Sequence, residues 1–321
     1  MRRLAVALFL LVCSCAAFAQ KNNVSHAFDY DAKAPLDTQD AGADFRGDVG
    51  IYDLSYANPK GARVSAYLVM PPGKGPFAAI LWGHWCWPNS DRHNRKEFLD
   101  EAVALAPSGV ASLLIDFPIA RPDYVSGKDP LSDKQVEELV EQVVAIRRGA
   151  DLLFSRPFVD QKRLAYVGHS CGASAGAVVS GIDKRFRAFV FMASPISDEA
   201  MVKTPQFQAF RQQAGAEKVD AFLAKYPWTD EGKYIAHAAP AVLLFQYATK
   251  EDFLTPELGK ATAALASDPK QVKVYDAPHA LNAEARNDRI AFLAQQLQFK
   301  APAPEVIAAI PELSQPSEPK P

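Results

Sequence analysis

The segment 168–172, Gly-His-Ser-Cys-Gly, places Ser170 between two glycines directly after the apolar run RLAYV. The spacing Gly-x-Ser-x-Gly is typical of a nucleophile elbow, a sharp turn between a strand and a helix that exposes the serine hydroxyl. In such a tight turn, a side chain at either glycine position would collide with neighbouring backbone. A turn whose serine merely caps the following helix has the same composition. The residues that would cooperate with Ser170 therefore decide the interpretation.

A serine hydroxyl needs a base that accepts its proton. His279 lies in the segment YDAPHALN, between an apolar segment that resembles a strand and a helical segment that begins near Asn282. This position predicts a loop at the carboxyl end of a strand, and His279 follows Ser170 in the chain order serine, acid, histidine. The alternative is a histidine that caps the helix or lies on the surface. We interpret His279 as the candidate base.

The base in turn needs a carboxylate that orients its ring. Glu251 and Asp252 are adjacent in the segment ATKEDFLTPE, which follows the apolar run AVLLFQY. Only one of the two can point at His279 while the other faces solvent. Glu251 lies at the offset after the strand where such an acid usually stands, whereas aspartate is the commoner residue type for the role. The sequence favours Glu251, leaves Asp252 as the alternative, and is also compatible with a solvated acidic turn.

Acyl transfer needs two backbone N–H groups that face the developing oxyanion. One candidate is the amide of Cys171, directly after the serine. The second should come from the loop after the run FAAILWG, where Cys86 is the first candidate and Trp85 the next. The rings of Trp85 and Trp87 would either line a substrate pocket or only pack the loop.

Alternating short apolar runs and longer helical patterns would position these residues. The helix 133–154 carries its apolar residues on one face. Five of the apolar runs lie between helical stretches and are apolar nearly throughout, as expected of parallel strands buried on both faces. The eight predicted strands are 51–56, 63–70, 77–83, 110–117, 163–168, 187–193, 241–247 and 271–276. The first two form an antiparallel pair, and the whole predicts an α/β fold with a mostly parallel eight-stranded sheet and helices on both faces.

Two segments between the strands are candidate walls of a site. Residues 194–240 show no strand pattern and predict a helical lid insert. Its aromatic residues are Phe207, Phe210, Phe222, Tyr226 and Trp228. These would form the core of the lid or contact substrate, and the first alternative is favoured. In the segment 119–127, Arg121 and Tyr124 are predicted to reach substrate.

The ends of the chain are predicted to lie outside the main domain. Residues 1–19 combine two arginines, a nine-residue apolar run and the sequence AFA, which is typical of a secretory signal peptide cleaved after Ala19. The apolar run is too short for a membrane span, and lipid attachment at Cys15 is the less favoured alternative. The main domain would cover residues 20–300, and the proline-rich segment 301–321 would lie on the surface or be disordered. The protein is therefore expected in the periplasm or outside the cell.

Composition and cysteine usage limit the remaining possibilities. The chain has 321 residues, 49% of them apolar and 22% charged, with a net charge of −2, so nothing indicates a nucleic-acid partner. Without the leader only Cys86 and Cys171 remain, which excludes a disulfide scaffold. If both amides face one oxyanion, the two α-carbons approach the range that a disulfide needs. Export would permit this bond, and two half-buried thiols are the alternative.

Four segments together carry a resemblance to a known family. They are GHSCGA, LWGHW, LLFQYATKEDFLTPE and YDAPHALNAEARNDRIAFL. They resemble the dienelactone hydrolase and prolyl-oligopeptidase-like branch of the α/β-hydrolases, over about residues 45–298. Dienelactone hydrolases proper use a cysteine where this chain has Ser170, and the acid expected at Glu251 is usually aspartate.

The resemblance implies a serine hydrolase that cleaves a small-molecule carboxylic ester through an acyl-enzyme on Ser170. It implies no metal and no organic cofactor, and the chain shows no His, Cys and carboxylate cluster with the spacing of metal ligands. A serine peptidase of the oligopeptidase type is one alternative. A catalytically inactive hydrolase-fold binding protein of the cell envelope is another. The sequence leaves the oligomeric state open.

Overall fold

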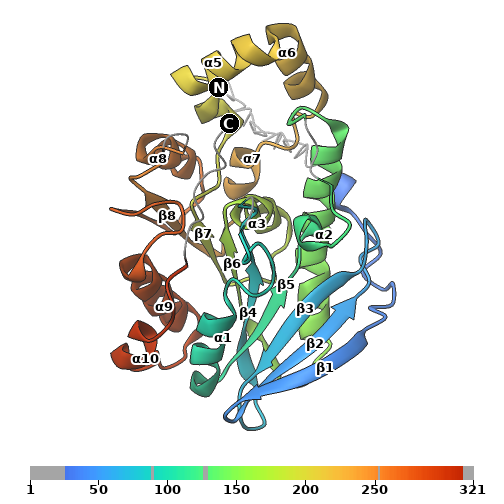
Figure 1. Cartoon of the computed structure of the whole chain (residues 1–321), viewed down its shortest axis with the longest axis vertical. Helices are drawn as coiled ribbons and strands as arrows, with labels where there is room; N and C mark the ends of the chain where they lie inside the picture. The colour runs from blue at the N-terminus through green and yellow to red at the C-terminus, as the bar shows by residue number, and fades with distance from the viewer. Residues whose placement is uncertain (1–25, 88–89, 126–128, 252–253, 314–321) are drawn as a thin grey trace, which may run out of the picture.

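The computed structural model describes residues 26–87, 90–125, 129–251 and 254–313 (Figure 1). A nine-stranded sheet in the order β1-β2-β3-β5-β4-β6-β7-β8-β9 forms its centre. The strands are β1 Gln39–Arg46, β2 Val49–Tyr56, β3 Val64–Met70, β4 Phe77–Gly83, β5 Val110–Ile115, β6 Val159–His169, β7 Ala188–Met192, β8 Val242–Ala248 and β9 Lys270–Tyr275. Strands β1, β2, β3 and β5 pair antiparallel, and the strands from β5 to β9 pair parallel.

The predicted mostly parallel sheet is present, but it has nine strands and not eight. The additional strand is β1, whose eight residues QDAGADFR are all exposed. It pairs with β2 through the backbone and buries no apolar face, so the sequence carries no alternating pattern that would have indicated it.

The apolar runs form the central strands because both faces of those strands are covered. Along β6, Leu164 and Tyr166 point into one hydrophobic core, and Ala165 and Val167 point into the other. Successive side chains of a strand alternate between faces, so a strand between two cores must be apolar throughout. This explains why five of the predicted strands read as continuous apolar runs.

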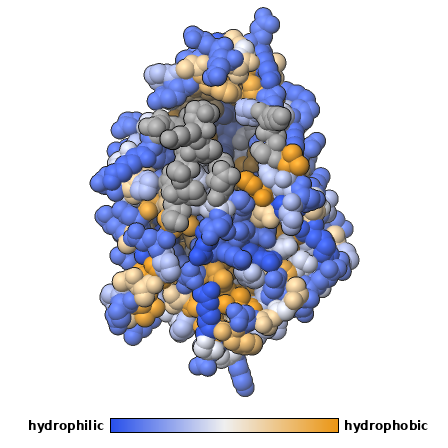
Figure 2. All heavy atoms as spheres, viewed as in Figure 1, coloured by the Kyte–Doolittle hydropathy of each residue, from blue (hydrophilic) through white to orange (hydrophobic). Residues whose placement is uncertain are grey.

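Helices cover both faces of the sheet, as predicted (Figure 1). The first face carries α2 Asp133–Phe154, α3 Cys171–Ile182, α7 Gly232–Ile235 and α8 Pro256–Ala264. The opposite face carries α1 Leu99–Leu105, α9 Ala283–Leu297 and α10 Pro304–Ala308. Helix α2 has the predicted bounds, and Asn282 caps α9 by accepting a hydrogen bond from the N–H of Ala285 at 3.0 Å. Figure 2 shows that most of one face of the molecule is hydrophilic, with apolar side chains in smaller groups.

The predicted insert 194–240 is helical and begins at the carboxyl end of β7. It contains α4 Asp198–Met201, α5 Pro205–Ala214, α6 Ala216–Lys225 and α7, and α5 and α6 form the upper end of the molecule in Figure 1. Rings in contact are Phe207 with Phe210, Phe222 with Tyr226, and Tyr226 with Trp228. Trp228 also packs edge-on against Phe28, 5.5 Å away between ring centroids. The aromatic residues of the insert therefore pack mainly against one another.

The proline-rich end of the chain is partly folded. Residues 301–313 include α10, and Ile307 and Ile310 are buried in the core against α1 and α9. Arg286 donates a hydrogen bond to the carbonyl oxygen of Pro311 at 3.1 Å. The described part of this segment thus packs on the domain and is not disordered. The predicted leader with Cys15, and residues 314–321, lie outside the described residues.

No helix in the described ranges is long and apolar enough to cross a bilayer.

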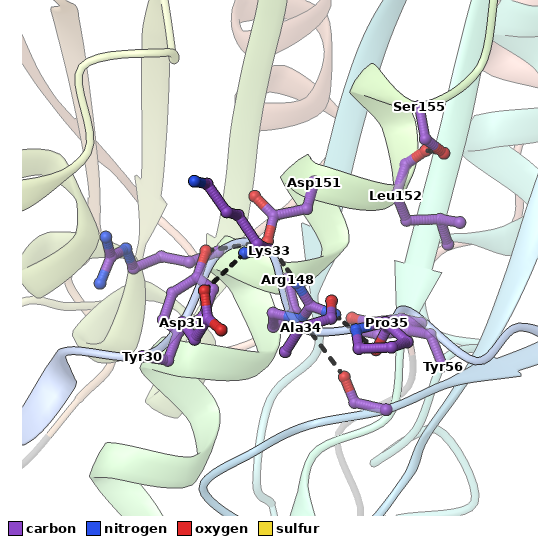
Figure 3. Close-up of polar contacts among 12 residues, drawn as sticks. Tyr30, Asp31, Lys33, Ala34, Pro35, Tyr56, Arg148, Asp151, Leu152 and Ser155 are labelled. Carbon is purple, nitrogen blue, oxygen red and sulfur yellow. Dashed lines mark hydrogen bonds and ion pairs between the residues drawn. The ribbon is translucent and has the colours of Figure 1, made fainter.

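A buried arginine fastens the N-terminal segment to α2. Arg148 is 1% exposed, and its guanidinium donates to the carbonyl oxygens of Ala34 and Pro35 at 2.9 and 3.0 Å (Figure 3). It also pairs with Asp151 at 2.9 Å, and the hydroxyl of Tyr30 donates to the same carboxylate at 3.0 Å. One buried side chain therefore joins two backbone carbonyl groups of the N-terminal segment to a carboxylate of α2, which also pairs with Arg185.

We expect Arg148→Met to lower the free energy of unfolding by about 1–3 kcal/mol, because it removes the hydrogen bonds to the carbonyl groups of Ala34 and Pro35 and one of the partners of Asp151. The measurement is urea unfolding followed by fluorescence and circular dichroism. Lys203→Met serves as the control, because Lys203 forms an exposed pair with Glu199 and should lose at most about 0.5 kcal/mol. Equal, small losses in both variants would contradict the anchoring role of Arg148.

Candidate active site

Ser170 lies at the turn between β6 and α3, in the strand–turn–helix context that the sequence predicts. Its backbone has φ 53° and ψ −118°, a conformation that is strained for a residue with a side chain. A Cβ at Gly168 would lie 2.5 Å from the carbonyl oxygen of Gly172, and a Cβ at Gly172 would lie 2.4 Å from that of Gly83. Both glycines are therefore required by close backbone approach, and the turn holds Ser170 in a tightly packed elbow.

His279 lies in the loop between β9 and α9 and contacts an acid from the loop after β8. Its Nδ1–H donates to Oε1 of Glu251 at 2.8 Å, and the two side chains are only 10% and 11% exposed. Glu251, the alternative that the sequence favours, thus contacts His279, while Asp252 lies outside the described residues. With the proton on Nδ1, the opposite nitrogen Nε2 is free to accept one.

The accepting nitrogen of His279 is available in this conformation. Nε2 is buried and makes no hydrogen bond to a described residue, Ser170 included. Hydrogen bonds between a nucleophile and its base are often long before substrate binds. The arrangement thus has an oriented imidazole with an unoccupied acceptor.

The sheet brings the loops of the site together. Strands β4 and β6 are parallel neighbours, and Gly83 at the end of β4 pairs with Gly168 near the end of β6. The strand order reverses at β4, which has β5 on one side and β6 on the other. Ligands of open α/β sheets bind beyond the carboxyl ends of the strands at such a reversal. The loops that follow β4 and β6 start side by side at this place.

A disulfide joins these two loops. Cys86 and Cys171 are bonded with an S–S distance of 2.02 Å and their α-carbons lie 5.8 Å apart. Of the two alternatives that the sequence left open, the disulfide is present. The N–H of Cys171 has no acceptor within α3 because it is the first residue of the helix, and that of Cys86 bonds to no described residue. The backbone N–H groups of the two bonded cysteines are thus both free to donate a hydrogen bond beside Ser170.

The structure assigns Trp85 a packing position. Its backbone N–H donates to Oε2 of Glu97 at 2.6 Å, so this amide is occupied and the oxyanion alternative at Trp85 is not supported. Its ring is fully buried and stacks on the ring of His169, with 5.0 Å between centroids. The ring of Trp87 is half-buried and lies 5.0 Å from that of His279. Of the two tryptophans, Trp87 remains the candidate for substrate contact.

Arg121 and Tyr124 are bonded to α2. Both terminal nitrogens of Arg121 donate to the carboxylate of Glu141 at 3.0 Å, and the hydroxyl of Tyr124 donates to Glu138 at 3.1 Å. The expectation that they reach substrate therefore finds no support in their contacts. It depended on which side chains α2 would present to this loop, and the sequence of the loop does not contain that information.

Two histidines of the site have structural partners that the sequence analysis missed. His169 is fully buried between Glu97 and the carbonyl oxygen of His279, at 2.6 and 2.9 Å. His84 donates from Nδ1 to the carbonyl oxygen of Trp85 at 2.6 Å. Burial lowers the pKa of His84 to about 3, so its ring is neutral. No sequence signal marks Glu97, which lies in the charged segment DRHNRKEFLD and reads as solvent-exposed.

The described residues include no group of three or more His, Cys, Asp or Glu side chains placed to hold a metal ion.

We expect the double variant Cys86→Ser, Cys171→Ser to lower the free energy of unfolding by about 2–4 kcal/mol, because the link closes a long loop. We also expect kcat to fall about tenfold to a hundredfold, since small displacements of groups at a reacting centre are costly. Urea unfolding and ester hydrolysis test the two effects. Lower stability with an unchanged kcat would mean that the link only holds the fold. Two free thiols in unreduced, denatured mature protein would contradict the disulfide.

Comparison with known proteins relates the chain to esterases and other hydrolases. No protein family model matches the sequence. Over 179 residues the chain is 27% identical to esterase FrsA of Enterobacter sp. (strain 638), a match that covers 56% of this chain and 40% of FrsA. The chain thus spans less than half the length of this curated relative.

Solved structures show the same architecture. An acetyl xylan esterase from Paenibacillus sp. R4 has a TM-score of 0.65 at 19% identity, with 82% of this chain and 90% of that chain covered. Acetyl xylan esterase 1 from Thermoanaerobacterium sp. JW/SL YS485 has a TM-score of 0.66 at 15% identity, covering 84% and 91%. The α/β-hydrolase GrgF from Penicillium sp. sh18 has a TM-score of 0.54 at 14% identity, covering 77% and 99%. At these identities the likeness is one of fold: the chain has the same α/β architecture as these esterases and this α/β-hydrolase.

Proposed function

We propose that this protein is an exported serine hydrolase that cleaves a carboxylic ester of a small molecule through an acyl-enzyme on Ser170. The observation that carries the proposal is the oriented imidazole of His279, which is held by Glu251 and has a free buried Nε2, in a fold that places Ser170 in a strained elbow. The matched esterase and the esterases among the structural neighbours support the ester as the bond that is cleaved.

The first half of the reaction forms the acyl-enzyme. Ser170 Oγ attacks the ester carbonyl carbon while His279 Nε2 accepts the hydroxyl proton. Glu251 holds the proton on Nδ1 and stabilises the imidazolium that forms. The negative charge that develops on the carbonyl oxygen is stabilised by the N–H groups of Cys86 and Cys171. His279 then donates its proton to the leaving oxygen, the C–O bond breaks, and the alcohol departs.

The second half releases the acid. A water molecule attacks the acyl carbon, and His279 Nε2 accepts its proton. The tetrahedral intermediate again places its oxyanion between the two amides. It collapses with return of the proton to Ser170 Oγ, which regenerates the free serine and releases the carboxylic acid. Besides the ester and one water molecule, the steps use only groups of this chain.

A panel of p-nitrophenyl esters of rising acyl chain length, measured beside peptidyl p-nitroanilides, tests the reaction class. Because two of the structural neighbours are acetyl xylan esterases, the panel begins with the acetyl ester. We expect hydrolysis of esters and no comparable hydrolysis of the anilides. Comparable kcat/KM values for both would favour a peptidase. Hydrolysis of neither, together with no reaction toward a fluorophosphonate, would favour a binding protein.

Export rests on the leader, and the disulfide beside Ser170 supports it because such bonds persist in oxidising compartments. We expect the full-length chain, expressed in a bacterium with an active export route, to yield a mature form that begins at Gln20. The measurement is the intact mass of the protein from the periplasmic fraction. An uncleaved chain in the cytoplasm would contradict export, and a lipid-modified chain that begins at Cys15 would identify a lipoprotein.

A further inference from the structure

The ring of His169 lies between the carboxylate of Glu97 and the backbone carbonyl oxygen of His279. A carbonyl oxygen and an ionised carboxylate can only accept hydrogen bonds. Nδ1 is 2.6 Å from Oε1 of Glu97, and Nε2 is 2.9 Å from the carbonyl oxygen of His279. A neutral imidazole has one N–H group, and an ionised carboxylate has none. Both contacts are hydrogen bonds only if the pair of side chains holds a second proton, either on the ring or on the carboxyl group.

The second oxygen of Glu97 strengthens this argument. Oε2 accepts the backbone N–H of Trp85 at 2.6 Å, in the loop whose Cys86 amide faces the oxyanion in the proposed mechanism. The side chains of Glu97 and His169 are 1% and 0% exposed, so water does not screen them. An uncompensated carboxylate here would repel the oxyanion. With a second proton, the pair of Glu97 and His169 has no net charge.

We propose that Glu97 and His169 are positioning residues that hold this second proton and form a neutral bridge between the loop of Trp85 and the loop of His279. The kinetic part of this inference rests on the proposed function, whereas the proton count does not. The bridge fixes the loop that carries an oxyanion donor relative to the loop that carries the base, with Ser170 next to His169 between them.

Ring packing supports a rigid bridge. The centroid distances are 5.0 Å from Trp85 to His169 and 5.2 Å from His169 to His279, and both ring pairs are stacked. The stack and the two hydrogen bonds of His169 join the loops after β4, β6 and β9, and the disulfide joins the first two of these. Loss of the bridge would therefore let the loops after β4 and β9 shift relative to the elbow.

Other ionisable groups surround the pair but do not replace the second proton. His279 on the base loop bonds to Glu251, and the phenol of Tyr166 on β6, whose pKa burial and the charge of Glu97 raise, donates to the carbonyl oxygen of Gly172. A cavity of about 150 Å³ between α1 and α9 also borders Glu97. Its charged side chains are Asp91, Arg92, Asp100, Glu101, Arg286, Arg289 and Glu312. Within it, Glu101 is bonded to Arg289, and Arg92 pairs with Asp100 at 3.7 Å.

Glu97→Gln reproduces the neutral bridge without a titratable proton. The glutamine oxygen can accept the N–H of Trp85, and its amide nitrogen can donate to Nδ1 of a neutral His169, whose Nε2–H still donates to His279. We expect this variant to keep kcat within about tenfold of the wild type, whereas Glu97→Met should lose about a hundredfold with little change in KM.

The decisive readout is NMR of the full chain labelled with ¹⁵N-histidine, which reports which ring nitrogens carry protons. We expect Nε2 of His169 to be protonated in the wild type at neutral pH, and His169 to be the neutral Nε2–H tautomer in Glu97→Gln. An unprotonated Nε2 in the wild type would overturn the proposal. This result stands whether or not Glu97→Met folds and whether or not Ser170 is the nucleophile.

Glu101→Gln is the matched control, because it changes another buried carboxylate of the same region, the partner of Arg289. We expect it to lower stability and to leave the His169 ring signals unchanged. A kcat loss in Glu97→Gln as large as that in Glu97→Met would show that the neutral bridge is not what positions the loops.

Discussion

Ser170→Ala is expected to lower kcat for ester hydrolysis by about 10⁴ to 10⁶-fold, because it removes the atom that attacks the carbonyl carbon. The free energy of unfolding should change little, since the alanine keeps the packed elbow between Gly168 and Gly172. The measurement is hydrolysis of the best p-nitrophenyl ester under saturating substrate.

Ser174→Ala is the matched control for this variant. Ser174 lies one turn further along α3, and its hydroxyl bonds to that of Ser194 at 2.8 Å. We expect its kcat to stay within about tenfold of the wild type, since it does not face the reacting atoms in the proposed mechanism. Retention of more than about a hundredth of the wild-type kcat in Ser170→Ala would remove Ser170 from the role of nucleophile.

Glu251→Gln should lower kcat by about 10⁴-fold with little change in KM. The amide can donate to Nδ1 of His279 and so favours the tautomer whose proton sits on Nε2, where the base must accept one. The 2.8 Å bond between Glu251 and His279 is the structural basis of this expectation. The assay is ester hydrolysis at several substrate concentrations, which separates kcat from KM.

Asp252→Asn is the variant to compare with Glu251→Gln, because the two acids are adjacent in the sequence. Since Glu251 makes the bond to His279, the change at Asp252 should cause only a mild loss. A large loss at Asp252 and a mild one at Glu251 would reverse the assignment. Equal, mild losses at both positions would mean that neither carboxylate orients His279.

The sequence predicted those parts of the structure that local patterns determine. Continuous apolar runs indicated the central strands because burial on both faces leaves no other composition, and Gly168 and Gly172 indicated a turn in which backbone segments nearly touch. The proximity of Cys86 and Cys171 was predicted by a geometric argument, since two amides that face one point bring these residues together, but the sequence left open whether they are bonded. Strand β1 is exposed and buries no apolar face, so its sequence contains no hydrophobic pattern that would have indicated a strand.

Contacts between distant segments were harder to predict. Arg121 is bonded to Glu141 and not to a site, which depends on the position of α2 in the fold. Glu97 lies among charged residues, which predicts an exposed acid. It is nevertheless buried against His169 and accepts a hydrogen bond from the backbone N–H of Trp85. Each case depends on a tertiary partner far away in the sequence, which periodicity and spacing do not contain.

Reaction of the mature protein with a fluorophosphonate, followed by intact-mass measurement and peptide mapping, tests the central claim most directly. The account predicts one adduct per chain, located on Ser170, with loss of ester hydrolysis in proportion to labelling. It also predicts no adduct in Ser170→Ala and much slower labelling in Glu251→Gln. An adduct on another residue, or a protein that hydrolyses esters while Ser170 stays unlabelled, would contradict the account.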